Sequence, residues 1–432
     1  MVCLFEQIKY KKIRRAFLKK YNARDFDLSD IDIQICELAD TIYKKYKSKF
    51  HSIRHNKNGV GFFVTELYDT GGHTVCLVNQ IESMYGLSDM HLFCSQFDET
   101  VHEAPKSLSR IRKCAAVSGI NLQHKNFIKD LIVLYNQIAD DCPSVVFVYI
   151  HMWDLLFTAV MHLLKKNAGL KIVFSNHASH FPNVGMTLAD VILEGMPTTK
   201  RITEEKRHLQ NGLIIGLQSV GKNDTQYYSL NEINAKKTEI GIPENSQLTV
   251  TGGSSYKLFD GDKSPYFEMI FELLRDNDCL HHLVITNMRN KEYEILNRIF
   301  AGYEYLLSRL HIVPLTSSYD LLFQCADVFI DSFPVSSAMT QIDLMRMRVA
   351  SVVKINRENP MFSFHEYMPL DYPYMYDNAS DMKRGIEYLL GHPKARSQII
   401  DSEYKYWLST YERDIVRDKY MKIIKGLKNA NN

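Results

Sequence analysis

The sequence has few of the features that mark membrane, secreted or metal-binding proteins. No uninterrupted apolar run in its 432 residues is long enough to span a bilayer. The first residues, MVCLFEQIKYKK, place basic side chains after a very short apolar stretch, unlike a secretory signal. The eight cysteines are scattered, with neither a C-x-x-C pair nor zinc-type spacing, which suggests reduced thiols. These absences predict a cytoplasmic protein that holds no metal.

The sequence also has little net charge. Its 52 Lys and Arg residues and 50 Asp and Glu residues leave a formal charge of +2, which gives no electrostatic reason to expect a nucleic-acid binder. The apolar and charged fractions, 45% and 24%, are those of a globular enzyme-sized protein. The chain is too long for one ordinary core, so we expect two domains.

One segment departs from this balance. Residues 9–21, KYKKIRRAFLKKY, carry seven Lys or Arg in thirteen positions, with Ile13, Phe17 and Leu18 at helical spacing. A basic amphipathic helix can lie on an anionic membrane, so peripheral contact with the inner face of the membrane is one hypothesis. A solvated helix that packs on its own domain explains the same residues.

Hydrophobic patterning divides the chain into two β-α-β series. Short apolar runs without alternation predict strands buried on both faces of parallel sheets, and helical patterns separate them. We expect an α/β protein with two doubly wound, Rossmann-like domains that face a central cleft, with ligands beyond the carboxyl ends of the strands. The predicted parts are a basic helical segment (1–55), a first domain (56–222), a polar linker (223–247), a second domain (248–395) and C-terminal helices (396–432).

The second series contains two loops suited to anionic oxygens. VTGGSSYKL (250–258) leaves a strand through Gly252 and Gly253 and continues through Ser254 to Lys257. Exposed amides and an ammonium group suit a diphosphate, although the stretch is not a Walker A loop. A purely structural turn is the alternative.

The other loop belongs to FIDSFPVSSAMTQIDLMRMR (329–348). Ser336, Ser337 and Thr340 gather at the start of a predicted helix, where hydroxyls and the helix N-terminus stabilise anionic oxygens. Asp343 follows one turn later and could accept hydrogen bonds from vicinal ribose hydroxyls. An N-capped helix with a solvated aspartate is the alternative.

These two loops resemble the donor-binding half of GT-B glycosyltransferases. In order and spacing, residues 248–356 are most similar to the O-GlcNAc-transferase and HMW1C-type glucosyltransferase group. The resemblance implies that Lys257 binds the nucleotide diphosphate and that Thr340 and Asp343 lie near the diphosphate and ribose. The sequence departs from that group at Ala338, where a histidine is usual, at Ser336–Ser337, which replaces an Asn-Gly-like pair, and at 349–351, which replaces a Gly-Pro.

The resemblance implies transfer of a sugar from a nucleotide-sugar, with a UDP-sugar favoured, to a glycan, lipid-linked or protein acceptor, and without a cofactor. It points to bacterial surface-glycan synthesis. The absence of a D-x-D motif after a hydrophobic strand and of an E-x7-E motif favours metal-independent, inverting transfer. Arg289 and Lys291 are supporting cations or ordinary surface charges. The predicted donor-binding residues are Gly71, Gly72, Gly252, Gly253, Ser254, Lys257, Asn287, Ser336, Ser337, Thr340 and Asp343.

In the first series, GFFVTELYDTGGHT (61–74) follows a strand with two glycines and a histidine. In GT-B enzymes such a loop lets the backbone approach the sugar phosphates, which is the implied role of Gly71 and Gly72. His73 suits a general base, because its ordinary pKa lies near neutral pH. Glu66 or Asp69 would orient it or replace it. A Gly-Gly entry into a helix, with His73 at its start, is the alternative.

Three more candidates follow strands of the first series. FSNHASHFPNVG (174–185) resembles the N-H-A-x-H segment of bacterial sugar transferases. We assign His177 to the leaving phosphate or to the acceptor, and Asn176, His180 and the strand-end His151 to the acceptor. The H-x-x-H pair lacks a third metal ligand at a familiar spacing. Each ring alone is equally explained as a satisfied loop histidine.

Two other functions remain open at this point. A non-catalytic GT-B-like subunit that activates or scaffolds a partner transferase fits the departures at Ala338 and Ser336–Ser337. A nucleotide-sugar epimerase would use the same architecture, with paired carboxylates and a histidine, and would need no acceptor.

Overall fold

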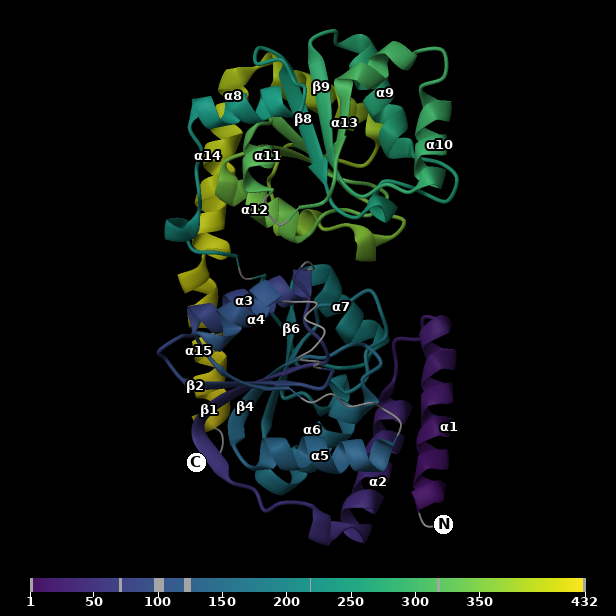
Figure 1. Ribbon diagram of the computed structural model, residues 1–432, viewed down its shortest axis with the longest axis vertical. Coiled ribbons are helices and arrows are strands. Elements are labelled where there is room, and N and C mark those ends of the chain that lie inside the picture. The colour runs from purple at the N-terminus through teal and green to yellow at the C-terminus, as the bar shows by residue number, and fades with distance from the viewer. Residues whose placement is uncertain are drawn as a thin grey trace. The chain divides into compact units, whose positions relative to one another are not determined.

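The computed structural model describes residues 3–69, 72–96, 105–119, 126–217, 219–316 and 319–429. Gly71 of the predicted donor site therefore lies outside the described residues. The chain divides into two compact units (Figure 1). Unit 1 comprises Met1–Gln218 and Val416–Asn432, and unit 2 comprises Ser219–Ile415.

Unit 1 is built on a seven-stranded parallel sheet in the order β3-β2-β1-β4-β5-β6-β7. The chain runs outward from β1 to β3 and then returns to β4 on the other side of β1, which makes a topological switch point between β1 and β4. Val64 pairs with Cys94 and with Tyr149, so the carboxyl ends of β1, β2 and β4 lie side by side along one edge of the sheet. The strands are β1 (His55–Val64), β2 (Asp89–Cys94), β3 (Ala116–Gly119), β4 (Cys142–Tyr149), β5 (Lys171–Ser175), β6 (Val191–Glu194) and β7 (Gly212–Ile214).

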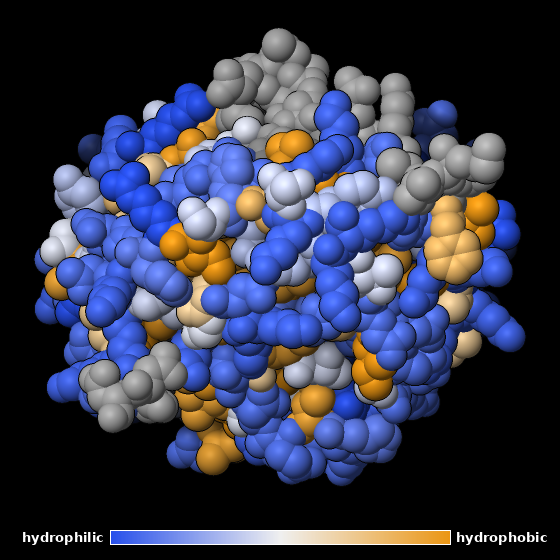
Figure 2. Space-filling view, turned by 90° about the horizontal axis from the view of Figure 1, so that it is seen from below, coloured by the Kyte–Doolittle hydropathy of each residue, from blue (hydrophilic) through white to orange (hydrophobic). Residues whose placement is uncertain are grey.

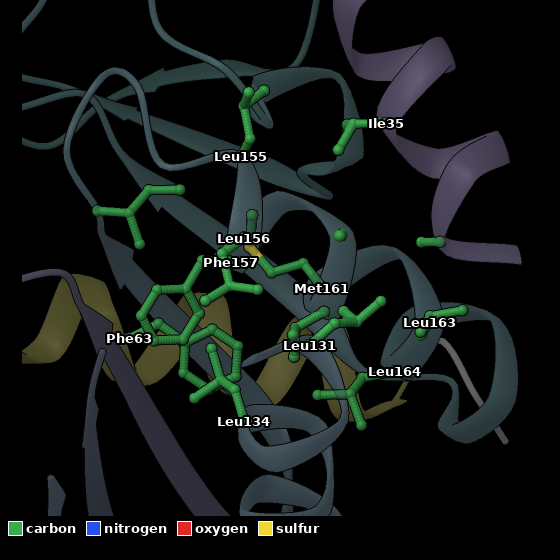
Figure 3. Packing of buried hydrophobic residues seen from close by; sticks show 14 of the residues in the cluster. Ile35, Phe63, Leu131, Leu134, Leu155, Leu156, Phe157, Met161, Leu163 and Leu164 are labelled. Atoms are coloured by element: carbon green, nitrogen blue, oxygen red, sulfur yellow. The ribbon is translucent and has the colours of Figure 1, made fainter. Parts of the chain in front are cut away.

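Helices cover both faces of this sheet because successive strand side chains point to opposite sides. Phe63 stacks on Phe157 at 4.9 Å between ring centroids, among leucines of two helices (Figure 3). Its neighbour Phe62 points the other way and stacks on Phe147, which contacts Tyr420 of the last helix at 5.6 Å. The helices of unit 1 are α1 (Cys3–Asn22), α2 (Ser29–Lys45), α3 (Gly72–Ser83), α4 (Pro105–Arg112), α5 (Phe127–Ala139), α6 (Leu155–Ala168), α7 (Pro197–Lys206) and most of α15 (Arg413–Asn429).

The basic helix α1 is anchored in the core of unit 1. Ile13 and Phe17 are each 1% exposed, and they join one hydrophobic cluster with α2, α5 and α6. Full burial of such a side chain stabilises the fold by about 1.5–3 kcal/mol. Leu18, by contrast, is 42% exposed. The helix therefore packs on its own unit and still presents apolar side chains to solvent.

Unit 2 has a six-stranded parallel sheet in the order β10-β9-β8-β11-β12-β13, with its switch point between β8 and β11. Its strands are β8 (Gln247–Gly252), β9 (Leu280–Ile285), β10 (Leu310–Val313), β11 (Val328–Ile330), β12 (Ala350–Lys354) and β13 (Met375–Tyr376). Its helices are α8 (Leu230–Glu239), α9 (Pro265–Asp276), α10 (Asn290–Ile299), α11 (Asp320–Gln324), α12 (Met339–Met347), α13 (Ala379–Gly391) and α14 (Pro393–Thr410).

The predicted α/β class with two parallel sheets is confirmed. The segment predicted as a linker, 223–247, contains α8, and the C-terminal helical segment divides between the units: α14 lies in unit 2, and the chain from Val416 lies in unit 1. Among the helices that the structure describes, none combines the length and apolar character needed to cross a membrane.

Candidate functional site

Three imidazole rings meet at the switch-point edge of the unit 1 sheet. His73 lies in the first turn of α3, His151 just beyond β4 and His177 just beyond β5. The ring centroid of His73 is 5.3 Å from that of His177 and 6.0 Å from that of His151. The fold thus brings together three histidines that the sequence places after separate strands.

This histidine cluster (His73, His151 and His177) is uncharged at neutral pH. Burial lowers the pKa of His177 to about 3, and the neighbouring His73 shifts it in the same direction. Burial also lowers the pKa of His73 and that of His151, against the opposing effect of the Glu66 carboxylate. Because an uncharged imidazole can accept a proton, the cluster can supply a base at neutral pH.

A polar network fixes His151 in place. Its Nδ1 is 3.1 Å from Oε1 of Glu66, at ion-pair distance but outside hydrogen-bonding geometry. Its backbone N–H donates to Oγ1 of Thr65 at 2.8 Å, and that hydroxyl donates to Oδ2 of Asp154 at 2.6 Å. Asp154 caps α6 by accepting from the N–H of Phe157 at 2.9 Å. The network ties the ends of β1 and β4 to the start of α6.

Two aromatic side chains that the sequence analysis missed border the histidine cluster. The ring of Tyr68 lies 5.6 Å from that of His73, and the ring of Trp153 lies 5.0 Å from that of His151. Trp153 is 46% exposed. The sequence signal that could have revealed Trp153 is its position two residues after His151, a histidine at the end of a strand.

Asp69 has a structural task in this arrangement. Its Oδ1 accepts from the N–H of Ser107 at 2.9 Å and its Oδ2 from that of Lys106 at 3.3 Å, at the start of α4. Burial by itself would raise the pKa of Asp69, but these donors together outweigh it, and the pKa of Asp69 lies below its ordinary value. The carboxylate therefore caps α4. Gly72 is the first residue of α3.

Asn176 and His180 also have contacts away from the three rings. Asn176 donates to both carboxylate oxygens of Glu194, at 3.1 and 3.0 Å, and is 7% exposed. The ring of His180 lies 4.3 Å from that of Phe181. Asn176 therefore fastens the loop after β5 to the end of β6.

In unit 2, Lys257 lies beside the loop that follows β11. Its Nζ donates to the carbonyl oxygen of Ser336 at 3.4 Å, and it makes no ion pair among the described residues. Burial lowers the pKa of Lys257, whereas the charge of nearby Asp331 raises it. The ammonium group is therefore partly dehydrated and has no directly paired carboxylate, so an anion would stabilise it.

Asp331 organises this loop and is a residue that the sequence analysis missed as part of the site. It is fully buried, and burial raises its pKa to about 6 against the effects of its hydrogen bonds and of Lys257. The hydroxyl of Ser336 donates to it at 2.6 Å and the N–H of Ser337 at 2.9 Å. Gln341 donates to the Ser336 oxygen at 3.0 Å. Ser336 and Ser337 thus shape the loop from within.

The two glycines at the end of β8, Gly252 and Gly253, meet different structural requirements. Gly253 has φ of +145°, a conformation that side chains rarely adopt. A Cβ on Gly252 would lie 2.9 Å from Cζ of Phe323, so this glycine permits close packing of α11. Ser254, which follows, is exposed.

Asp343 is engaged inside the protein. Tyr319 donates its hydroxyl to Oδ2 at 2.9 Å, and Nε of Arg346 donates to Oδ1 at 3.4 Å. Asp343 is 7% exposed and Arg346 4%. A ribose would share this carboxylate with these internal partners. Thr340 lies half-buried in the first turn of α12.

The side chains beyond β9 have surface contacts. Arg289 donates through Nε to Oε1 of Glu292 at 3.0 Å, and Nζ of Lys291 lies 2.6 Å from Oδ1 of Asp262. Asn287 accepts from the backbone at 3.1 Å. Across the parts of the chain that the structure describes, no three His, Cys, Asp or Glu side chains come close enough together to hold a metal ion.

No family model matches the sequence, and no curated protein sequence matches it significantly. Solved structures do match. A glycosyltransferase from Rickettsia africae ESF-5 superposes with a TM-score of 0.66 and 12% identity, covering 86% of this chain and 99% of that one. HepE from Anabaena, in complex with UDP, superposes with a TM-score of 0.64 and 9% identity, covering 85% of this chain and 100% of that one. The chain has the GT-B fold.

A third GT-B structure covers nearly the whole chain. A variant of the Thermobaculum terrenum O-GlcNAc transferase matches 97% of this chain and 78% of that one, with a TM-score of 0.59 and 11% identity. The GT-B architecture predicted from the sequence is therefore confirmed. Within it, the histidine cluster lies at the switch point of one sheet, and Lys257 and Asp331 lie at the switch point of the other.

Proposed function

We propose that this protein is a glycosyltransferase that moves a hexosyl group from a nucleotide-sugar, a UDP-sugar by preference, to an acceptor hydroxyl. The environment of Lys257, a partly buried ammonium group whose described polar contact is a carbonyl oxygen, carries the proposal. The Anabaena HepE structures with UDP and with UDP-glucose, which share the GT-B fold, support it.

In this proposal unit 2 holds the donor. The diphosphate lies against Lys257, with the first turn of α12 and Thr340 as further contacts. As the bond between the anomeric carbon and the phosphate oxygen breaks, negative charge develops on that oxygen. A cation already in place stabilises this charge without reorganising solvent.

Unit 1 supplies the base. His73 takes the proton of the acceptor hydroxyl while the acceptor oxygen bonds to the anomeric carbon and the diphosphate departs. One displacement of this kind inverts the anomeric configuration and needs no covalent intermediate with the enzyme. Glu66, through His151, limits the orientations open to the ring of His73.

The test is a thermal-shift panel of the full chain against UDP, GDP, CDP and ADP, with and without magnesium. A ligand at one hundred times its dissociation constant stabilises the native state by about 2.7 kcal/mol. We expect one diphosphate to shift the transition without metal, and we expect Lys257→Met to abolish the shift. If no diphosphate shifts the wild-type protein, the donor roles of Lys257, Thr340 and Asp343 are wrong.

A non-catalytic activating subunit is the second candidate. The internal partners of Asp343 favour it, because they occupy a carboxylate that the resemblance assigns to ribose. Failure to bind any diphosphate would support it. Conversion of a UDP-sugar without any acceptor would instead identify an epimerase.

We also propose that the outer face of α1 contacts an anionic membrane from the cytoplasmic side. Phe5 is 72% exposed and Ile8 43%, and Lys12, Arg15 and Lys19 are exposed on the same helix. The face of the molecule seen in Figure 2 is largely hydrophilic, with hydrophobic residues singly or in small groups. Sedimentation with phosphatidylglycerol vesicles but not with phosphatidylcholine vesicles would support this contact, and equal binding to both would contradict its electrostatic basis.

A further inference from the structure

Trp153 is an exposed aromatic side chain beside the histidine cluster, and no internal role accounts for its exposure. It is one of two tryptophans in the chain and is 46% exposed, whereas the other, Trp407, is fully buried in unit 2. It follows β4 at the switch-point edge of the sheet. A large aromatic ring exposed beside candidate catalytic groups offers a surface that a ligand can cover.

The backbone holds Trp153 in a fixed position. The N–H of Asp154 donates to the carbonyl of His151 at 3.0 Å, and the N–H of Leu155 donates to the carbonyl of Trp153 at 2.9 Å. Asp154 is also the N-cap of α6, so the turn is tied to a helix end. The ring meets that of His151 at 76°, and the two rings therefore do not cover each other as a stacked pair would. With the backbone fixed in this way, only the side-chain torsions of Trp153 remain to be ordered when a ligand covers the ring.

The surroundings of Trp153 select the chemistry of the ligand. Tyr68 adds a second aromatic ring, 6.4 Å from that of His151, and His73 and His177 add two uncharged imidazoles. The carboxyls of Glu66 and Asp154 lie close enough to act on the charge of His151, and they would repel a phosphate. Aromatic faces with neutral hydrogen-bonding groups match a pyranose, because its C–H face carries partial positive charge and its edge carries hydroxyls.

We propose that Trp153 is the stacking platform for a neutral sugar ring of the acceptor, so that the acceptor is a glycan and not a peptide. This inference rests on the proposed glycosyl transfer and narrows its acceptor. Trp153 binds the acceptor sugar and takes no part in proton transfer.

The first experiment measures glycan binding without any donor. Labelled full-length protein is applied to an array of bacterial and synthetic neutral glycans and, in parallel, to an array of serine- and threonine-containing peptides. Each retained glycan is then titrated while tryptophan emission is recorded. We expect the emission to change in the wild-type protein and to stay constant in Trp153→Phe, in which only the buried Trp407 reports.

The second experiment compares variants. Because the loss of one aromatic contact corresponds to about a tenfold change in affinity, Trp153→Ala should bind the glycan about tenfold more weakly, and Trp153→Phe should lose clearly less. Tyr85→Ala is the matched control. Tyr85 is 64% exposed and lies between α3 and the start of β2, near the amino ends of the strands.

Three outcomes would overturn the inference: unchanged glycan binding in Trp153→Ala, an equal loss in Tyr85→Ala, or retention of peptides but no glycan by the wild-type protein. The diphosphate thermal shift separates this failure from that of the proposed function. Trp153→Ala should keep the shift in full, which also shows that the variant is folded, whereas a wild-type protein without the shift contradicts donor binding itself.

Discussion

The two units share a topology and differ in what burial does to their functional groups. In unit 1, burial lowers the pKa values of three histidines and leaves an uncharged cluster bordered by aromatic rings. In unit 2, burial lowers the pKa of the Lys257 ammonium group and raises that of the nearby Asp331, with no direct ion pair between them among the described contacts. The parallel sheet therefore fixes where such groups gather, and the residue types decide whether they offer uncharged imidazoles or a buried cation.

The substitution with the largest expected effect on turnover tests the proposed base in unit 1. His73→Gln should lower turnover by about 10²–10⁴-fold, because no base receives the acceptor proton, while the diphosphate thermal shift stays intact. Steady-state kinetics and the thermal shift together measure this. His55→Gln, an exposed histidine at the amino end of β1, is the matched control. Loss of the shift in His73→Gln would show that unit 1 also binds the donor.

Lys257→Met should show the converse pattern. We expect turnover to fall by about 10²–10³-fold, because the departing diphosphate loses its cation, and the diphosphate shift to disappear. Lys263→Met, at an exposed lysine in the same unit, should change neither. Turnover equal to wild type in Lys257→Met would remove this residue from the mechanism.

Asp343→Asn tests whether this residue serves the fold or the donor. Because Arg346 is 4% exposed and would lose one of its charged partners, we expect the free energy of unfolding to fall by about 1–3 kcal/mol. Urea denaturation measures this loss. As a comparison, Tyr319→Phe removes the other hydrogen-bond partner of Asp343. A weaker diphosphate affinity at unchanged stability would mean that the carboxylate binds ribose.

The smallest effect concerns pH. In the unfolded chain His177 binds a proton below its ordinary pKa of about 6.5, whereas in the folded protein it does so only near pH 3. The unfolded state therefore binds more protons between these values, and stability falls as the pH drops from 6.5, by at most about 1.4 kcal/mol per pH unit. His177→Phe should flatten this slope in urea denaturation at pH 7.5 and 5.5. An identical slope would show that His177 is protonated in the fold.

The sequence predicts the long elements of both sheets better than the short ones. β1 and β4 contain ten and eight residues, enough for an apolar run to be recognised, whereas β7 and β13 contain three and two. Such short strands exist because neighbouring strands pair with them, and local patterning does not carry that information.

The same limit applies to the candidate sites. Lys257 and His73 lie in the segments that follow β8 and β1, and their chemistry is visible in the sequence. That Asp331 lies near Lys257 depends on the pairing of β8 with β11, whose residues are about eighty positions apart. The partners of Asp343 could not be predicted from the sequence either, because the hydroxyl that donates to its Oδ2 belongs to Tyr319, outside α12.

The last helix begins in unit 2 and ends in unit 1, so unit 2 interrupts unit 1 in the sequence. Val416, Tyr420 and Ile424 are each less than 5% exposed, and Tyr420 covers Phe147 in the central strand β4. On the ribosome, the whole of unit 2 emerges before these residues do. The first unit to be synthesised is therefore the last to be completed, and in a nascent chain Phe147 lacks its contact with Tyr420 until the last helix has been made.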